Sequence, residues 1–353
     1  MQNDGEQIAG QYLRMQAKRL LFVAVLSVLI LLLAVGSTII GSAGLTFGEV
    51  FAAVLAGIFP GMFSADPLAF TIVWDLRLHR VLFAVVAGFG LAVAGAVMQG
   101  VLRNPLASPF TLGIASAATF GAAIAIIFVP TALSGEIALV ISAFSMSALA
   151  ALAIYGLSRY RGISAESMVL AGIILMYLFG AMTSFLQYTG TTEQLQAVVF
   201  WMFGSLQNTS WEKLALVSLV VGVATPLLVW RAWDLNALGM GDQVAQSLGV
   251  KVEQTRTLHM MVASLITASI ICFTGTIGFI GLVSPHITRL AIGGDHRYLV
   301  VASGFVGALI LLGADSLART ILAPQIIPVG IMTAFIGIPF FLYLFMRQKE
   351  EYW

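Results

Sequence analysis

The sequence has little charge, a single cysteine and no run of basic residues, and each shortage excludes a class of protein. Only 9% of its 353 residues are charged, while 59% are hydrophobic. A soluble domain carries about 25% charged residues, so this chain has too little polar surface to coat a water-soluble globule. The lone Cys272 excludes a disulfide framework and a cysteine-ligated metal site. A net charge of +1 without a basic cluster excludes nucleic-acid binding. The composition predicts a polytopic membrane protein.

The chain also lacks the residues of an enzyme or of a nucleotide site. A Walker A loop needs a lysine between a glycine and a serine or threonine, but the four lysines follow Ala17, Glu212, Val250 and Gln348. Any ATP must then be hydrolysed by another protein, and we expect this chain to bind no cofactor. The four histidines include no pair at metal-ligand spacing, which predicts no metal site. Nothing in the apolar runs indicates a catalytic serine–histidine or paired-aspartate arrangement.

Apolar runs of membrane length fill most of the chain. A hydrocarbon core about 30 Å thick requires roughly 20 apolar residues in a helix. On that basis the sequence predicts about ten spans, near 20–40, 81–101, 110–129, 136–157, 165–188, 212–231, 257–274, 277–292, 299–317 and 328–346. The eighth and ninth runs are short, which favours burial among other helices. Residues 46–58 contain Glu49 and stop at Pro60, so we expect an interfacial helix there rather than an eleventh crossing.

The distribution of basic residues predicts the orientation. Three of them precede the first span, so the N-terminus should be cytoplasmic. Ten crossings return the C-terminus to the same side. Of the 17 lysines and arginines, this topology leaves only four outside: Arg77, Arg80, Lys213 and Arg319. Spans two to five and seven to ten are weakly alike, which raises the possibility of an inverted repeat of the kind common in transporters.

The connection between spans six and seven, residues 234–254, has the pattern of a short helix held outside the membrane. Gly239 and Gly241 permit a sharp turn, Asp242 is the expected N-cap, and Gly249 can end the helix. One apolar face is expected from Val244, Ala245 and Leu248. The pattern alone leaves two interpretations open: a helix that docks into a groove of a soluble partner, and a solvated connector.

The outer arginines also admit two interpretations. Arg77 and Arg80 begin the second span and Arg319 ends the ninth, either as snorkelling anchors or as a basic surface for an acidic partner. Asp315 stands four residues before Arg319, which predicts a local ion pair. No other acid lies clearly in mid-membrane, and this weighs against coupling to an ion gradient.

Several blocks resemble one family of membrane proteins. The turn QGVLRNPLASP at 99–109 resembles the QG-LLRNPLA-P signature of the FecCD-type ABC importer permeases, which carry iron–siderophores, haem or cobalamin. GFIGLVSPHITRL followed by GGDHR, at 278–297, and GADSLARTILAPQIIPVGIMTAFIGIPFFLYL, at 313–344, are similar to two further family blocks. WMFGSL at 201–206 and residues 235–249 are similar as well. The resemblance covers nearly the whole chain from about residue 45.

The resemblance implies an all-α fold of about ten transmembrane helices, the type II ABC importer permease fold. It implies a homodimer with two ATPase subunits, which hold ATP and Mg, on the cytoplasmic side, and a periplasmic or extracellular substrate-binding protein on the other. The substrate would cross the bacterial inner membrane along spans five and ten. The expected organisation is a cytoplasmic segment (1–19), a transmembrane permease domain (20–346) that contains the coupling loop (234–254), and a cytoplasmic tail (347–353).

The resemblance also assigns roles to residues. It favours ATPase coupling for residues 235–249, with Leu235, Asn236, Leu238, Gly239, Gly241, Asp242, Ala245, Leu248 and Gly249 as the matching positions. It implies that the binding protein docks at Arg77, Arg80 and Arg319. It also implies a cytoplasmic gate formed by Ser164, Ala165, Glu166 and Ser167. Two positions depart from the family pattern: His79 replaces a proline, and Gln325 replaces a glutamate. The alternative function is a gradient-driven secondary transporter with inverted repeats.

Overall fold

The computed structural model describes residues 2–41, 44–129 and 135–347, and almost all of them lie in helices. Each predicted span corresponds to a helix. These ten helices are α1 (Gln2–Ile39), α4 (His79–Leu102), α5 (Ile114–Phe128), α6 (Gly135–Arg161), α7 (Ala165–Thr189), α9 (Trp211–Trp230), α12 (Val252–Thr274), α13 (Ile280–Ile292), α14 (His296–Thr320) and α15 (Val329–Arg347). The remaining elements are α2 (Phe47–Ile58), α3 (Pro67–Thr71), the π-helical η1 (Ile72–Leu78), α8 (Thr192–Met202), α10 (Ala232–Gly239) and α11 (Asp242–Ser247). The all-α membrane fold is therefore confirmed.

Helix lengths refine the predicted count. Seven of the described helical stretches are long and apolar enough to cross a membrane, and α2, α5, α13 and α15 contain shorter apolar helices. The short eighth run is confirmed as α13, a 13-residue helix with a largely buried face. The ninth run is confirmed as a helix buried among others, since 67% of its apolar window is buried, although α14 is longer than the run and has 25 residues. The two ends of α14, at His296 and Thr320, are polar, so they lie outside the apolar run although both are helical.

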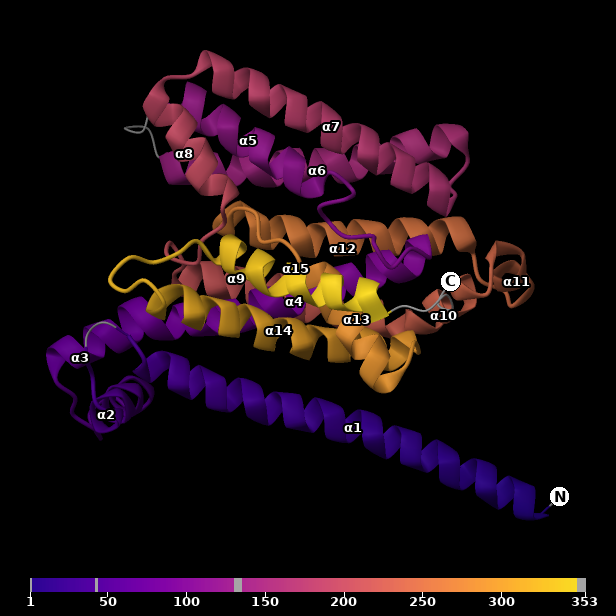
Figure 1. Cartoon of the computed structure of the whole chain (residues 1–353), viewed down its shortest axis with the longest axis horizontal. Helices are drawn as coiled ribbons and strands as arrows, with labels where there is room; N and C mark the ends of the chain where they lie inside the picture. The colour runs from indigo at the N-terminus through magenta and orange to yellow at the C-terminus, as the bar shows by residue number, and fades with distance from the viewer. Residues whose placement is uncertain (1, 42–43, 130–134, 348–353) are drawn as a thin grey trace.

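The helices form three layers around α4 (Figure 1). One layer contains α5 to α8, the middle layer contains α4, α9 and α12 to α15, and α1 lies along the opposite side. Most residues of α4 are buried, and α4 packs on α14, α12, α13 and α9. Glycines allow the closest of these approaches. A Cβ on Gly88 would overlap the Gly307 carbonyl of α14, and a Cβ on Gly95 would overlap the Gly281 carbonyl of α13.

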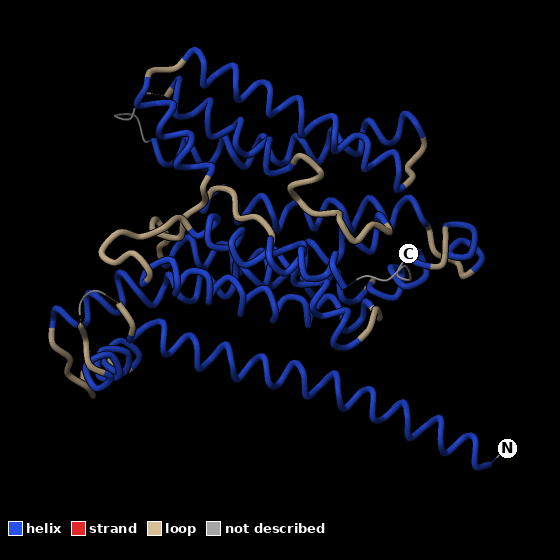
Figure 2. Tube along the Cα trace, in the orientation of Figure 1, coloured by secondary structure: helices blue, strands red, loops and turns tan. Residues whose placement is uncertain are grey.

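Helix α2 lies transverse to the long helices, because Figure 2 shows it end-on while they run in the plane of the view. Its first turn is closed by a capping box, in which the backbone N–H of Thr46 donates to Glu49 Oε2 at 2.7 Å. The Trp74 indole of η1 donates to the Ala53 carbonyl at 2.8 Å and holds α2 against the bundle. This orientation favours the predicted interfacial helix over an eleventh crossing.

Helix α1 is continuous from Gln2 to Ile39, so the described part of the predicted N-terminal segment joins the first span without a break. The domain boundaries stay a prediction. Helix α1 contacts α14 from Gln16, which donates to the Tyr298 hydroxyl at 3.4 Å, to Ser37, and its N-terminal end diverges from the bundle (Figure 1). The cytoplasmic location of that end stays a prediction. The predicted tail at 347–353 lies outside the described residues after Arg347.

Candidate functional site

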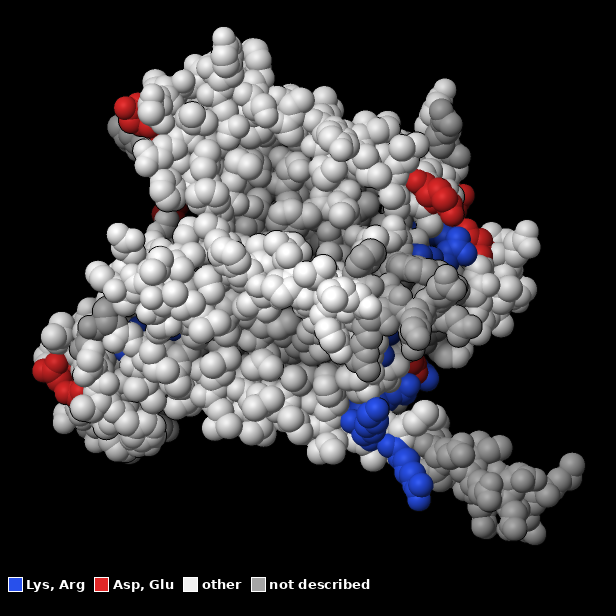
Figure 3. All heavy atoms as spheres, in the orientation of Figure 1, with Lys and Arg blue, Asp and Glu red and all other residues white. Residues whose placement is uncertain are grey.

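Polar chemistry is concentrated at the two ends of the bundle. Lysine and arginine side chains gather at the end that carries α10, α11 and the N-terminal part of α1 (Figure 3). At the opposite end, near α2 and α3, basic atoms show only in narrow gaps. Arg77 and Arg80 lie there with only 7% of their surface exposed. We call these the inner and the outer end.

The coupling segment at the inner end is the helix pair α10 and α11. Gly241 adopts φ 105° at the turn between the two helices, and Gly249 adopts φ 84° just after α11, so both turns require glycine. Asp242 is not the N-cap, because Gly241 occupies that position and the Asp242 carboxylate turns toward α12. The cap prediction was therefore wrong by one residue.

The two helices bury one face and expose another. Leu235, Leu238 and Ala245 are fully buried against the bundle. The predicted single apolar face is divided, because Val244 and Leu248 are 43% and 58% exposed while Ala245 faces inward. Met240 is 69% exposed beside them. An exposed apolar edge on two short helices suits insertion into a groove of a partner.

Asn236 joins α10 to the start of α14. Its side-chain amide donates to Asp295 Oδ1 at 2.8 Å, and its Oδ1 accepts the backbone N–H of His296 at 2.9 Å. Asp295 also accepts the guanidinium of Arg297 at 2.7 Å. Asn236 was assigned to coupling from the sequence, and the structure connects it to the GGDHR block.

Asp295 should make the stability of this connection depend on pH. Burial opposes its ionisation, but hydrogen bonds from Arg297 and Asn236 outweigh burial and lower the pKa of Asp295 to about 2. Because an unfolded aspartate has a pKa of about 4, the stabilisation is present above about pH 4 and is lost as pH falls toward about 2. We expect the free energy of unfolding to fall by about 1–2 kcal/mol over this interval, and Asp295→Asn to lack that fall. Acid titration of unfolding measures it, and an identical acid dependence in both proteins would contradict the assignment.

Asp242 connects α11 to three other segments. Arg256 of α12 donates two hydrogen bonds to its carboxylate, each 2.7 Å long, and these lower the pKa of Asp242. Arg103, in the turn at 99–109, lies 3.4 Å from the same carboxylate. Arg256 also donates to the carbonyl oxygen of Ile163 at 3.1 Å. Sequence reasoning did not identify Arg256, because its two partners, Asp242 and Ile163, are 14 and 93 residues away in sequence.

The predicted gate residues begin α7 directly after Ile163. Ser164 is the N-cap, and it exchanges backbone and side-chain hydrogen bonds with Ser167 in a capping box. Ala165 is buried and Glu166 is exposed. The structure thus brings the gate segment and the coupling segment to the two sides of Arg256. Their assigned roles stay predictions.

The turn at 99–109 is a compact connector at the inner end. Arg103 ends α4 in the left-handed conformation with φ 49°, and Asn104 Oδ1 accepts the backbone N–H of Leu106 at 2.9 Å. Gln99 accepts a hydrogen bond of 3.2 Å from Arg289 of α13. The predicted reversal of the chain is confirmed, and the turn contacts both α13 and α11.

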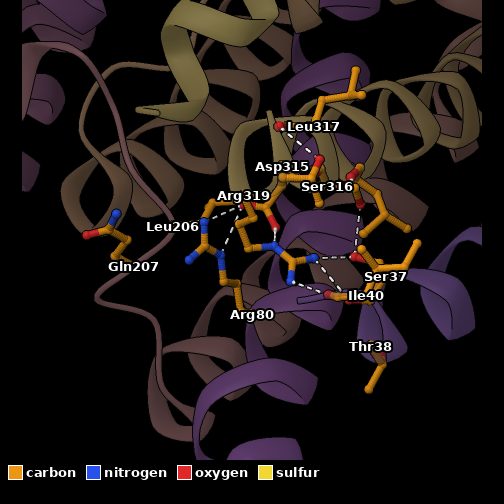
Figure 4. Close-up of polar contacts among 12 residues, drawn as sticks. Ser37, Thr38, Ile40, Arg80, Leu206, Gln207, Asp315, Ser316, Leu317 and Arg319 are labelled. Carbon is orange, nitrogen blue, oxygen red and sulfur yellow. Dashed lines mark hydrogen bonds and ion pairs between the residues drawn. The ribbon is translucent and has the colours of Figure 1, made fainter. Parts of the chain in front are cut away.

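At the outer end, Asp315 accepts two arginines (Figure 4). Arg80 lies 2.7 Å from its carboxylate, and Arg319 lies 3.0 Å from it, so the predicted ion pair within α14 is confirmed. Arg319 also donates to the Ser37 carbonyl at 3.1 Å, and Arg77 donates to the Thr38 carbonyl at 2.9 Å. All three guanidinium groups therefore face other helices of the chain. The docking role of these arginines stays a prediction.

His79 replaces the proline of the family pattern by holding the end of η1. Its Nε2 donates to the Asp75 carbonyl at 2.7 Å, and its Nδ1 lies 3.1 Å from the Thr209 hydroxyl. A proline at this position would have no side-chain donor for the Asp75 carbonyl. Sequence reasoning missed this π-helical segment.

The structure adds one negative finding and one cavity. Within residues 2–41, 44–129 and 135–347, no three His, Cys, Asp or Glu side chains lie close enough together to hold a metal ion. A cavity of about 700 Å³ lies among α5, α6, α8, α9 and α12 and is lined by no residue of α7 or α15. It therefore does not coincide with the pathway expected along spans five and ten.

Comparisons with known proteins identify the family. The sequence model of the FecCD transport family matches residues 26–347. The hemin transport system permease protein HmuU of Yersinia pestis is 37% identical over 334 residues, which cover 94% of this chain and 97% of that protein. The cobalamin import system permease protein BtuC of Halobacterium salinarum is 37% identical over 292 residues, 82% of this chain and 77% of that protein. A solved structure described as an inward-facing conformation of an ABC transporter, assigned to the metal-chelate type, superposes with a TM-score of 0.80 at 31% identity, over 92% of this chain and 99% of that one. The chain therefore belongs to the FecCD transport family of ATP-binding-cassette permeases.

Proposed function

We propose that this permease imports an iron chelate, haem or a cobalamin-like nutrient, with energy from a separate ATPase. The observation that carries the proposal is the α10–α11 pair, which buries Leu235 and Leu238 in the bundle and leaves Val244 and Leu248 exposed. The hemin and cobalamin permeases among its relatives support the substrate class. ATP and Mg belong to the partner, since no lysine of this chain lies in a Walker A loop.

The translocation pathway requires a second copy of the chain. Helices α7 and α15 correspond to spans five and ten, and both expose large apolar side chains. They include Leu170, Ile174, Tyr177, Phe185, Phe335, Ile338 and Leu342. Two such faces brought together in a homodimer would bury this surface and enclose a path between the copies. The cavity of a single chain supports this reading, because it lies away from both helices.

The outer end is the proposed docking side for a periplasmic or extracellular substrate-binding protein. Arg77, Arg80 and Arg319 hold the outer ends of α1, α4 and α14 together, so they shape this surface even though they point inward. The concentration of basic side chains at the inner end supports a cytoplasmic location for α10, α11 and both termini. The membrane would then be the bacterial inner membrane.

The function is tested in lipid vesicles that hold the permease and its ATPase, with the binding protein added outside. We expect the substrate-loaded binding protein to stimulate ATP hydrolysis and to drive uptake that an uncoupler leaves unchanged. A variant ATPase without its Walker A lysine is the control, and it should abolish both signals. Uptake that persists without the ATPase and collapses with an uncoupler would instead establish the gradient-driven alternative.

A further inference from the structure

Arg256 is the largest fully buried side chain in the described part of the protein. None of its surface is exposed, yet it carries a charge and lies in the second turn of α12. A buried guanidinium is retained only where its donors find acceptors. Nη1 and Nη2 each donate a hydrogen bond to the Asp242 carboxylate, and Nη1 also donates to the Ile163 carbonyl. Nε has no partner within the described residues.

The two acceptors belong to segments that no other hydrogen bond or ion pair joins within the described residues. Asp242 is the first residue of α11, the exposed helix of the coupling segment. Ile163 directly precedes Ser164, the N-cap of α7. The guanidinium group of Arg256 therefore connects α11 to the start of α7. A displacement of α11 toward or away from the bundle would be transmitted to α7 through this group.

Near its start, helix α7 makes a close backbone contact and borders a cavity. Leu112 packs so tightly on Gly172 of α7 that a Cβ there would lie 2.8 Å from the Leu112 Cα. Beside this contact, a cavity of about 210 Å³ separates Asn104 and Thr111 from Val169 and Met176. The contact supplies a pivot, and the cavity supplies room for α7 to tilt on it.

We propose that Arg256 is a positioning residue that transmits movement of the coupling helix α11 to the cytoplasmic start of α7. The proposal rests on the proposed function, in which an ATPase moves α11. Arg256 contacts neither the substrate nor ATP. Its guanidinium must hold the carboxylate and the carbonyl simultaneously, which the single ammonium group of lysine does less well in this geometry.

The test uses the complete transporter in lipid vesicles, with its ATPase and binding protein. Arg256→Lys and Arg256→Gln are compared with Arg231→Gln, a matched arginine that pairs with Asp234 at 2.7 Å without reaching the start of α7. The ratio of ATP hydrolysed to substrate imported is the main readout, since a loss of folded protein alone would not change it. A second readout is the distance between spin labels on cysteines placed at Gln246 and at Tyr160, which is 91% exposed and lies three residues before Ile163, after replacement of Cys272 by serine.

The expected result is an ATP-to-substrate ratio about tenfold higher in both Arg256 variants, within the range of typical coupling energies. Arg231→Gln should keep the ratio of the unsubstituted protein. The label distance should stay narrow in every nucleotide state of the unsubstituted protein and broaden in Arg256→Lys. An unchanged ratio in both variants, an equal rise in Arg231→Gln, or loss of assembly in both variants would overturn the proposal. Failure of the proposed function is a different result, because ATP would then drive no uptake by the unsubstituted transporter.

Discussion

Replacement of Asp315 by asparagine is expected to lower the free energy of unfolding by about 3–5 kcal/mol. The carboxylate is fully buried and accepts both Arg80, at 2.7 Å, and Arg319, at 3.0 Å. An amide of the same size keeps the volume but removes the negative charge. Two buried guanidinium groups would then repel each other without a counter-ion. The thermal midpoint and the denaturant midpoint of the purified protein measure the loss.

The control for Asp315 is a carboxylate in an exposed ion pair. Glu136 pairs with Lys213, but 65% of its side chain is exposed, so Glu136→Gln should cost at most about 1 kcal/mol. Asp315→Asn should also release α1, because Arg319 donates to the Ser37 carbonyl only while Asp315 orients it. A cysteine placed at Ser37, which is 1% exposed, would report this release through faster alkylation. Equal stability of the two variants would show that Asp315 does not hold the outer end together.

The spans could be predicted from the sequence because each depends on a local property, an apolar run of sufficient length. The ion pair of Asp315 with Arg319 could be predicted for the same reason, since its partners are four residues apart in one helix. The partner of Asp315 in α4 could not. Arg80 is 235 residues away in sequence, and only the packing of α4 on α14 brings it within 2.7 Å. The outer arginines were therefore interpreted as surface groups although all three face inward.

The coupling segment also combines local features that the sequence predicts with tertiary contacts that it does not. Its turns at Gly241 and Gly249 follow from local residue preferences and are confirmed, whereas Gly239 is the last residue of α10 and is not needed for a turn. The N-cap at Asp242 was wrong because a capping preference is weak compared with two charge-assisted hydrogen bonds from Arg256. The contact between Arg256 and Ile163 has no sequence signal at all, because a backbone carbonyl accepts whichever donor the fold brings to it. The inverted repeat stays a prediction.

Replacement of Gly95 by alanine is expected to destabilise the protein by about 3 kcal/mol, at the upper end of overpacking effects. The added Cβ would overlap the carbonyl oxygen and the Cα of Gly281, so α4 and α13 would have to move apart. A side chain in its path could rotate away, but backbone atoms of a packed helix cannot. Gly88, seven residues earlier and therefore on the same face of α4, repeats this arrangement against Gly307 of α14, so one face of α4 depends on glycine at two backbone contacts.

Gly222 of α9 supplies the matched control, because no atom lies within 4 Å of the position that its Cβ would occupy. Alanine there removes the conformational freedom of glycine without a clash, so Gly222→Ala should stabilise the helix by about 0.5–1 kcal/mol. The two identical substitutions should therefore change the unfolding midpoint in opposite directions. A stabilised or neutral Gly95→Ala would mean that α13 can yield at Pro285, inside its own helix, and that α4 is not the rigid centre of the bundle. A loss confined to Gly95→Ala would establish that the fold depends on backbone contact along α4, which no larger residue at that position permits.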